Sequence, residues 1–358
     1  MQRLGLVGLP NSGKTSLFNA LTGSSAPVAP HPFSTTETAR AVAQVPDPRL
    51  DALARASSSR KVVPAGLEVV DIAGLVAGSA SGEGLGNRFL GGIREVDALC
   101  LVLRSFEDPG VPGEADPLGS LQVLQLELVL ADLESLEARL ERRRKAARAE
   151  RSLAGEVAAM EEAVAALQAG SPLWRADLDP ERRRLLGPCF LLTDKPVLAV
   201  VNLGEDQLGA TAEELAKAVA ADLGGGEVVA ACVQLEAEAA RLPAEDRAEL
   251  LGGLGLGEGA LVRVTRAAYH LLGLRTFFTT GEKESRAWTF RAGARAPECA
   301  GHIHSDLQRG FIRAEVVGWA ELVEAGSWAA AKAAGKVRLE GKDYRVEDGD
   351  VLEVRFNV

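Results

Sequence analysis

The fold of this chain is decided near its amino end by the stretch Gly8-Leu9-Pro10-Asn11-Ser12-Gly13-Lys14-Thr15. The stretch fits the phosphate-binding pattern GxxxxGK(S/T). It stands between an apolar run at 4–7, typical of a strand, and a helical segment at 14–21. This strand-loop-helix context predicts an α/β P-loop domain that binds a nucleoside triphosphate, whereas the motif alone would also fit a glycine-rich turn.

The residue types within this loop suit an anionic ligand. Gly8 and Gly13 let the backbone turn tightly, so that successive N–H groups point inward. The start of the following helix adds its dipole and its unpaired N–H groups. We expect Lys14 to reach the β- and γ-phosphates and the Thr15 hydroxyl to bind Mg²⁺.

A second phosphate-sensing motif, Asp71-Ile72-Ala73-Gly74, ends the apolar run at 67–70. In P-loop switch proteins such a DxxG places the aspartate in the Mg²⁺ shell and the glycine N–H at the γ-phosphate. The polar segment 29–37 stands where these proteins keep their first switch loop. Thr35 is our choice for the threonine that closes over Mg²⁺, with Thr36 as the alternative.

The position that reads the base follows the apolar strand-like run 196–201 and carries Asn202-Leu203-Gly204-Glu205. GTP-specific proteins usually have NKxD here, in which the aspartate accepts hydrogen bonds from the guanine N1–H and 2-amino groups. Leu203 replaces the lysine, and the longer Glu205 need not reach the guanine edge. The pattern weakens guanine selection and makes ATP plausible.

The composition excludes several classes of function. The chain has 358 residues, 47% hydrophobic and 25% charged, with a net charge of -10, which argues against a uniformly basic nucleic-acid binder. Four scattered cysteines with no CxxC spacing favour a reducing compartment over a disulfide framework. Residues 1–7 read as a strand, so no signal peptide is expected, and no apolar run reaches a membrane span. We expect a cytoplasmic protein without membrane association.

These motifs, with several longer blocks, resemble the YchF/Ola1 family, which is related to the Obg P-loop proteins. The blocks run nearly end to end and are GLPNSGKTSLFNALT (8–22), PDPRLDAL (46–53), DIAGLVAGSASGEGLGNRFL (71–90), TGEKESRAWTF (280–290), GFIRAEV (310–316) and EGKDYRVEDGDVLEVRFNV (340–358). The resemblance implies a Mg²⁺-dependent ATPase that prefers ATP to GTP, with an inserted helical domain, a C-terminal TGS domain and association with the ribosome, on its large subunit.

The resemblance also assigns residues one by one. The phosphate-binding segment falls on Asn11, Ser12, Gly13, Lys14, Thr15 and Ser16. The magnesium positions fall on Thr15 and Thr35, to which the DxxG motif adds Asp71. Leu203 falls beside Asn202 at the adenine-contacting position, with Glu205 closing the motif. Lys14 and Gly74 are the expected catalytic groups.

The sequence departs at two places from related P-loop enzymes, and both affect the expected catalytic mechanism. Leu75 stands where Ras-like enzymes place the glutamine that orients the attacking water, and leucine cannot hydrogen-bond that water. The region 104–113 lacks the histidine that family members often carry there. Backbone groups or a bound partner are then left to position the water. Asn11 is a candidate ligand of K⁺, as in related Obg-type proteins.

Residues 118–170 change character, with long charged helical patterns and few turn residues. Two apolar stripes with alternating spacings of three and four predict an antiparallel hairpin joined near 151–155, with arms of about 25 residues that extend roughly 35–40 Å. Arg142-Arg143-Arg144-Lys145, with Arg148 and Arg151, lies near its tip. The run fits a solvated helix surface or a contact with ribosomal RNA.

The C-terminal part reads as a small β-rich unit, a β-grasp by resemblance to TGS domains. We expect strands at 287–291, 312–317, 336–339, 344–346 and 351–356, and a short helix at 303–308. His302 and His304 lack further clustered ligands and are expected to be structural. The predicted domains are a P-loop domain at 1–120 and 193–275, a helical insertion at 121–192 and the TGS domain at 276–358.

The sequence therefore predicts an ATPase switch that binds Mg²⁺, ATP and the ribosome, with RNA contacts through the hairpin and TGS domain. Two alternatives stay open. Asn202 and the carboxylate of Glu205 would also suit a GTPase or an enzyme that accepts both nucleotides. Leu75 and the missing histidine would suit a non-catalytic adaptor that is gated by nucleotide.

Overall fold

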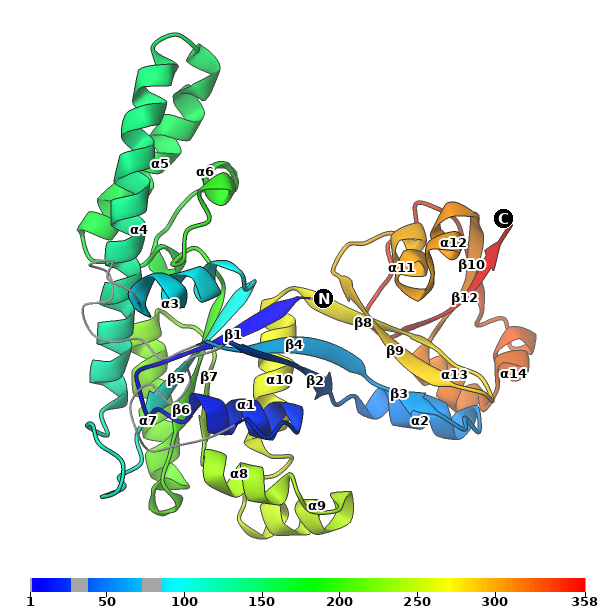
Figure 1. Ribbon diagram of the computed structural model, residues 1–358. Coiled ribbons are helices and arrows are strands. Elements are labelled where there is room, and N and C mark those ends of the chain that lie inside the picture. The colour runs from blue at the N-terminus through cyan, green and yellow to red at the C-terminus, as the bar shows by residue number, and fades with distance from the viewer. Residues whose placement is uncertain (1, 27–37, 73–84, 358) are drawn as a thin grey trace. The chain divides into compact units, whose positions relative to one another are not determined.

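The structure is a computed structural model that describes residues 2–26, 38–72 and 85–357 (Figure 1). The chain folds as two compact units. Unit 1 contains residues 1–43 and 68–268, and unit 2 contains residues 44–67 and 269–358.

Unit 1 is built on a six-stranded sheet in the order β2-β4-β1-β5-β6-β7. Its strands are β1 (Arg3–Val7), β2 (Ala39–Val45), β4 (Ala65–Asp71), β5 (Ala98–Arg104), β6 (Val197–Asn202) and β7 (Val228–Ala231). The neighbours from β4 to β7 pair in parallel. Every residue of β5 and β6 is buried, as expected for parallel strands covered on both faces. The carboxyl ends of β1, β4 and β6 carry the predicted phosphate and base motifs.

The helices of unit 1 are, in chain order, α1 (Lys14–Thr22), α3 (Leu85–Arg94), α4 (Pro117–Ala147), α5 (Ala154–Gln168), α6 (Pro180–Leu186), α7 (Ala210–Leu223), α8 (Val233–Ala239), α9 (Ala244–Gly253) and α10 (Ala260–Leu271). Apolar side chains of α3, α4 and α7 share one core with the sheet, so these helices cover the same face. The helix α1, which follows the phosphate loop, lies against β1 and α8.

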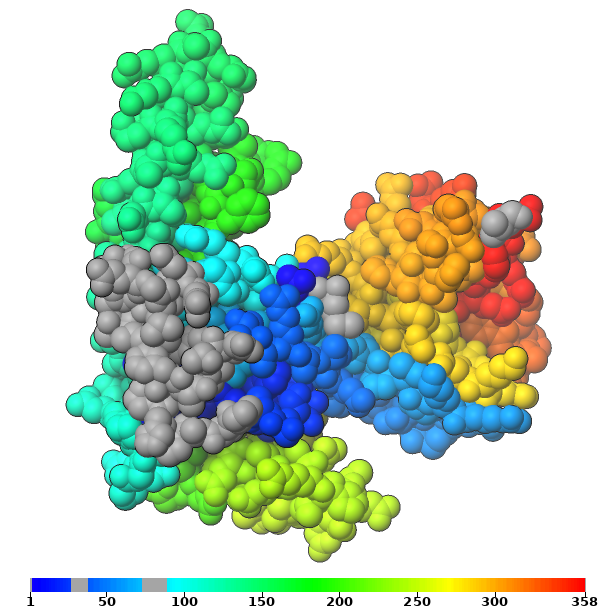
Figure 2. Space-filling view, viewed as in Figure 1, coloured from blue at the N-terminus to red at the C-terminus, as the bar shows by residue number. Residues whose placement is uncertain are grey.

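The helical hairpin is confirmed, but the prediction of two equal arms is wrong. Helix α4 has 31 residues and α5 has 15, which correspond to about 46 Å and about 22 Å. A 3₁₀ turn at Arg151–Leu153 joins them. The first arm is longer because its amino-terminal half, with Leu121 and Leu128, belongs to the core of the sheet. Only its outer half packs against α5, and there the hairpin stands out from unit 1 (Figure 2).

Unit 2 contains a mixed six-stranded sheet in the order β11-β10-β12-β8-β9-β3. Its strands are β3 (Val62–Val63), β8 (Leu274–Thr279), β9 (Ser285–Arg291), β10 (Phe311–Gly318), β11 (Arg338–Glu340) and β12 (Asp350–Phe356). Its helices are α2 (Pro48–Ala56), α11 (Ala296–Ile303), α12 (Ser305–Arg309), α13 (Trp319–Ala325) and α14 (Trp328–Ala333). Side chains of α11 pack with those of β8, β9 and β10 in one core.

Two details of unit 2 differ from the sequence prediction. Residues 344–346 form no strand, because Arg345 makes only an isolated bridge to Arg295. The short helix predicted at 303–308 is α12, but it begins at Ser305 and follows α11 directly, and His304 between them caps α12 by accepting a hydrogen bond from the Asp306 N–H. His304 therefore has a structural role.

The segment 44–67 belongs to unit 2, which the sequence prediction did not anticipate. Asp47 caps α2 by accepting from the Arg49 N–H, with Pro48 as the first helical residue. The Arg49 guanidinium then bridges Asp47 and Asp348, at 2.7 Å from each. This ion-pair network fixes the PDPRLDAL block to the C-terminal sheet.

The predicted fold class is confirmed: a P-loop α/β domain with an inserted helical hairpin, followed by a β-rich C-terminal domain. The four-part set of domain boundaries stays a prediction. Among the described residues, no helix is long and apolar enough to cross a membrane, and no group of three or more His, Cys, Asp or Glu could hold a metal ion. All four cysteines are free.

Candidate nucleotide-binding site

The backbone of the phosphate loop requires its glycines. Gly13 has φ 90°, and a Cβ there would lie 2.2 Å from the Asn202 Nδ2. A Cβ on Gly8 would lie 2.5 Å from the carbonyl oxygen of Val102 on β5. Both contacts are shorter than any side chain tolerates, so the loop can pass this close to the sheet only with glycine. The loop thereby places the first turn of α1 at the carboxyl end of β1.

Asn202 ties the phosphate loop to the base-reading strand. Its Nδ2 donates to the Ser12 carbonyl at 3.1 Å, and its Oδ1 accepts from the Val233 N–H at 3.2 Å. The side chain is buried between these two backbone segments. Its first role is thus to hold the end of β6 against the loop, and its predicted contact with a purine stays a prediction.

Lys14 folds back onto its own loop. Its Nζ donates to the carbonyls of Gly8 and Leu9, at 3.0 and 2.9 Å. Lys14 as a whole is 7% exposed, and burial lowers its pKa to about 8, an effect that the nearby Asp71 carboxylate partly opposes. Among the described residues no carboxylate forms an ion pair with Lys14, and a phosphate chain in the loop would supply such an anionic partner.

Two of the predicted Mg²⁺ ligands, Thr15 and Asp71, lie among the described residues and contact each other. The Thr15 Oγ1 donates to the Asp71 Oδ2 at 2.7 Å, which brings together the start of α1 and the end of β4. Burial raises the pKa of Asp71 above its ordinary value, although the Thr15 hydroxyl and the Lys14 charge lower it. The Asp71 Oδ1 is buried and has no hydrogen-bond partner among the described residues. A hydroxyl and a carboxylate with a spare oxygen are hard ligands that fit Mg²⁺.

Thr35, Gly74 and Leu75 lie outside the described residues. The closing threonine, the γ-phosphate sensor and the replaced glutamine therefore stay predictions.

A cavity of about 450 Å³ opens beside the loop, at the place predicted for the base. It is lined by Gly13, Ser16, Phe106, Glu107, Asp108, Asn202, Leu203, Gly204, Glu205, Asp206, Cys232, Val233, Gln234, Ala237, Glu238 and Arg241. Leu203 is buried, whereas Glu205 is exposed on a 3₁₀ turn at Glu205–Gln207. The structure thus brings the base motif and the phosphate loop to one cavity.

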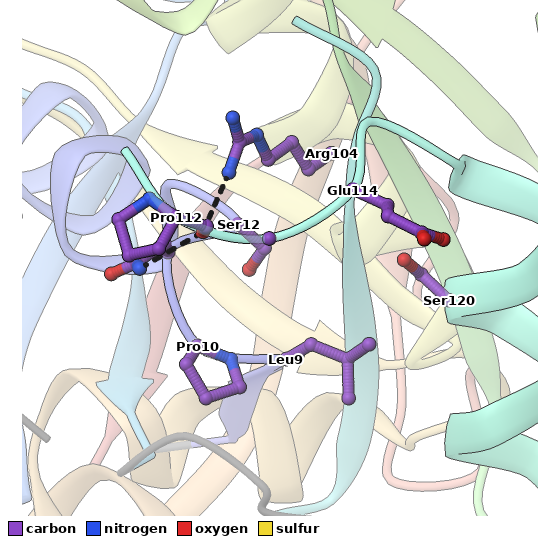
Figure 3. Close-up of a pocket in the computed structure, with 9 residues that line it drawn as sticks. Leu9, Pro10, Ser12, Arg104, Pro112, Glu114 and Ser120 are labelled. Carbon is purple, nitrogen blue, oxygen red and sulfur yellow. Dashed lines mark hydrogen bonds between the residues drawn. The ribbon is translucent and has the colours of Figure 1, made fainter. Parts of the chain in front are cut away.

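A second cavity of about 300 Å³ lies against Leu9, Pro10, Asn11 and Ser12 (Figure 3). Its opposite wall is formed by Arg104 and by Pro112, Gly113 and Glu114 from the segment after β5. The Asn11 Nδ2 donates to the Pro112 carbonyl at 3.3 Å. The assignment of Asn11 to K⁺ stays a prediction.

Sequence reasoning missed Arg104. It is 5% exposed at the end of β5, where every other residue is apolar. A lone arginine that ends a buried strand was the available signal, because a charge is buried only where specific partners hold it. Its partners here are backbone carbonyls, which the sequence does not reveal.

The fold and this arrangement of loop, lysine, hydroxyl and carboxylate define the class of P-loop nucleoside-triphosphate hydrolases. Two family models match the chain. Residues 3–149 match the model described as a 50S ribosome-binding GTPase. Residues 274–357 match the YchF-GTPase C-terminal model, described as a protein of unknown function.

Relatives cover the whole length of the chain. The ribosome-binding ATPase YchF of Bacillus subtilis is 44% identical over 99% of both chains, and that of Escherichia coli O157:H7 is 42% identical with the same coverage. A solved structure, the Schizosaccharomyces pombe YchF GTPase, matches with a TM-score of 0.86 and 32% identity, over 99% of this chain and 97% of that one. The chain therefore belongs to the YchF family, whose members are called both ATPase and GTPase in these names.

Proposed function

We propose that the chain is a Mg²⁺-dependent ATPase that prefers ATP to GTP and works as a nucleotide-controlled switch on the ribosome. The observation that carries the proposal is a complete phosphate loop that shares one cavity with a base motif lacking the guanine-reading residues. Where a GTPase would have lysine and aspartate, this cavity has Leu203 and Glu205.

Hydrogen bonding explains the choice of base. Guanine is selected when a carboxylate accepts from its N1–H and 2-amino groups, and a site built for such bonds rejects a base that lacks them. Leu203 offers only apolar contact, and Glu205 stands exposed on its turn. That turn is held in place, because the Gly204 N–H donates to the Gln207 Oε1 and the Gln207 Nε2 donates to the Ser105 carbonyl. In this cavity guanine therefore has no hydrogen-bonding advantage over adenine.

The chain's own residues supply binding and orientation. Lys14 turns its ammonium from the loop carbonyls to the β- and γ-phosphates, and the loop N–H groups hold the phosphate oxygens. Thr15 and Asp71 would hold Mg²⁺, with Thr35 closing over it, and the ion would neutralise charge on the phosphates. The Gly74 N–H would sense the γ-phosphate. Backbone groups or a ribosomal partner would position the water that Leu75 cannot hold.

One continuous helix supports the switch. The first half of α4 belongs to the core of the nucleotide domain, and its second half, with Leu136 and Leu140, forms the core of the hairpin. A shift of α4 against the sheet would therefore move the hairpin as a lever. The C-terminal domain would act as a TGS recognition module.

The ribosome is proposed as partner from the names of the relatives and from the charge of the hairpin. Among the described residues, Arg139, Arg142 and Arg148 form no ion pair, whereas Arg143 and Arg144 pair with glutamates of α5. Arg139, Arg142 and Arg143 lie together around a shallow surface depression on α4. Unpaired arginines suit the phosphates of ribosomal RNA, with the large subunit as the expected side. Such a partner places the protein in the cytoplasm.

Phosphate release in single-turnover experiments, with and without ribosomes, tests the enzymatic part. We expect slow ATP hydrolysis that ribosomes accelerate and that Lys14→Ala abolishes. Hydrolysis of GTP at the same rate as ATP would favour the dual-specificity alternative, which the retained Glu205 carboxylate in the cavity supports. Nucleotide binding with no hydrolysis under either condition would favour the non-catalytic adaptor.

A further inference from the structure

The segment between β5 and α4 touches both sides of the nucleotide site. We call residues 105–114 the strap. Phe106, Glu107 and Asp108 of the strap line the base cavity. Pro112, Gly113 and Glu114 line the second cavity, beside the phosphate loop. One short segment thus forms a wall of each cavity.

Arg104 holds the strap in this shape. Its Nε donates to the Phe106 carbonyl at 3.0 Å, its Nη2 to the Val111 carbonyl at 3.2 Å and its Nη1 to the Pro112 carbonyl at 3.0 Å. The guanidinium also lies 4.7 Å from the centre of the Phe106 ring. None of the described residues forms an ion pair with Arg104. The buried charge is therefore held by the carbonyls and the ring of the strap.

The Pro112 carbonyl joins the strap to the phosphate loop. It accepts from Arg104 and also from the Asn11 Nδ2, at 3.3 Å (Figure 3). Asn11 has φ 61°, a left-handed conformation that is uncommon for residues other than glycine, although asparagine adopts it more readily than most. The strap is thus one of the contacts that hold Asn11 in this conformation.

We propose that Arg104 is a positioning residue that couples purine binding to the conformation of the phosphate loop. A base in the larger cavity meets Phe106 at one end of the strap, and Asn11 meets Pro112 at the other. The planar fork of Arg104 spans both ends, so displacement at one end is passed to the other. A lysine cannot replace it, because an ammonium has no such fork. The inference rests on the proposed nucleotide function, to which it adds Arg104 as the residue that links the base cavity to the phosphate loop.

Measuring the affinities for ATP and for inorganic tripolyphosphate distinguishes an effect at the base cavity from an effect at the phosphate loop. Arg104→Lys is expected to weaken ATP binding on the order of tenfold, the loss typical of hydrogen bonds made by a charged group. Tripolyphosphate meets only the loop, which keeps the Asn11 bond to the Pro112 carbonyl in this variant, so its affinity should fall by no more than about twofold, well below the loss for ATP. The matched control is Arg266→Lys, since Arg266 makes an equally forked pair with Glu258 on the exposed face of α10. The control should change neither affinity.

A double-mutant cycle tests the shared carbonyl. Asn11→Ala and Arg104→Lys each remove a donor to the same Pro112 oxygen, so their effects on kcat should be non-additive. Additive effects would overturn the coupling. So would an ATP affinity unchanged in Arg104→Lys, or an equal loss for ATP and tripolyphosphate.

If Arg104→Lys does not fold, Phe106→Leu takes its place, because it removes the ring beside the guanidinium and leaves the arginine. The same loss for ATP alone is expected, and an unchanged ATP affinity would count against the proposal. A wild-type protein that binds tripolyphosphate but neither ATP nor GTP would instead refute the proposed function.

Discussion

Lys14 carries a buried positive charge whose hydrogen-bond partners are two carbonyls of its own loop. Because burial lowers the pKa of this ammonium to about 8, the free protein begins to lose the proton near that pH. Triphosphate oxygens favour the charged form and move the pKa back toward its ordinary value of 10.5. The nucleotide-bound protein then holds a proton that the free protein has released.

Proton uptake on binding follows directly. We expect ATP affinity to fall as the pH rises above about 8, and binding to take up a proton between there and the ordinary lysine pKa. Titration calorimetry in two buffers of different ionisation enthalpy measures this uptake. Equal heats in both buffers at about pH 9 would contradict the burial of the lysine charge.

Phe190 is an exposed aromatic residue in an unfavourable backbone conformation. It has φ 53° at the end of a 3₁₀ turn, Gly187–Cys189, and is 69% exposed. A left-handed conformation is costly for a residue with a Cβ, and the exposed ring recovers little of that cost by burial.

Relief of this strain gives a stability prediction. Phe190→Gly should raise the free energy of unfolding by about 1 kcal/mol, because glycine adopts positive φ without steric cost. Phe190→Ala keeps the Cβ and is the matched control, with little change expected. Urea unfolding followed by circular dichroism compares them, and equal stabilities of the two variants would rule out strain at this position.

At the scale of elements, α4 is fixed to the rest of unit 1 by a buried carboxylate. The Asp132 oxygens accept from the N–H groups of Leu192 and Thr193, at 2.8 and 2.7 Å, and from the Thr193 hydroxyl at 2.7 Å. These bonds hold the segment that leads into β6 against the middle of the helix, where the two cores of α4 meet.

Asp132→Ala should therefore lower the free energy of unfolding by about 3 kcal/mol, since it leaves two buried N–H groups without acceptors. Thr193→Val removes only the hydroxyl bond, and we expect a loss of about 1 kcal/mol from it. Denaturant titration measures both variants. A loss for Asp132→Ala no larger than that for Thr193→Val would show that the N–H groups find other acceptors.

The elements show what the sequence could reveal. The glycine pattern, the apolar run before it and the leucine stripes are local signals, so the phosphate loop, its flanking strand and helix and the hairpin were predicted. The lengths of the arms were not, because the stripe of α4 does not show which turns face the sheet and which face α5.

The candidate site was predictable to the same extent. Local motifs located Lys14, Thr15, Asp71 and the base motif at 202–205. The bond from the Asn202 side chain to the Ser12 carbonyl joins residues 190 positions apart. The Arg104 side chain reaches carbonyls only two to eight positions along the chain, but these contacts depend on the path of an irregular segment. Segment 44–67 likewise joins unit 2 through contacts distant in sequence, such as the pair of Arg49 with Asp348 and the pairing of β3 with β9. No pattern within one segment specifies such contacts.

At the scale of the whole molecule, the net charge of -10 contrasts with Arg139, Arg142 and Arg148 of the hairpin, which form no ion pair with any described residue. A cationic surface on an acidic protein directs a polyanion to one place. Arg142→Glu should weaken ribosome binding on the order of tenfold, about 1.4 kcal/mol, and the loss should shrink at high salt.

Cosedimentation with ribosomes measures that loss. The matched control is Lys217→Glu, because Lys217 lies exposed on α7 with only a weak pair to Glu213 at 3.7 Å. If both variants bind equally less, net charge alone is responsible and the hairpin surface has no specific role.

The most direct measurement of the central claim is the affinity of the nucleotide-free protein for ATP and for GTP, titrated side by side with Mg²⁺ present. The account predicts that ATP binds more tightly, because the cavity offers Leu203 and an exposed Glu205 where guanine needs a close carboxylate. Tight GTP binding with negligible binding of ATP would contradict it.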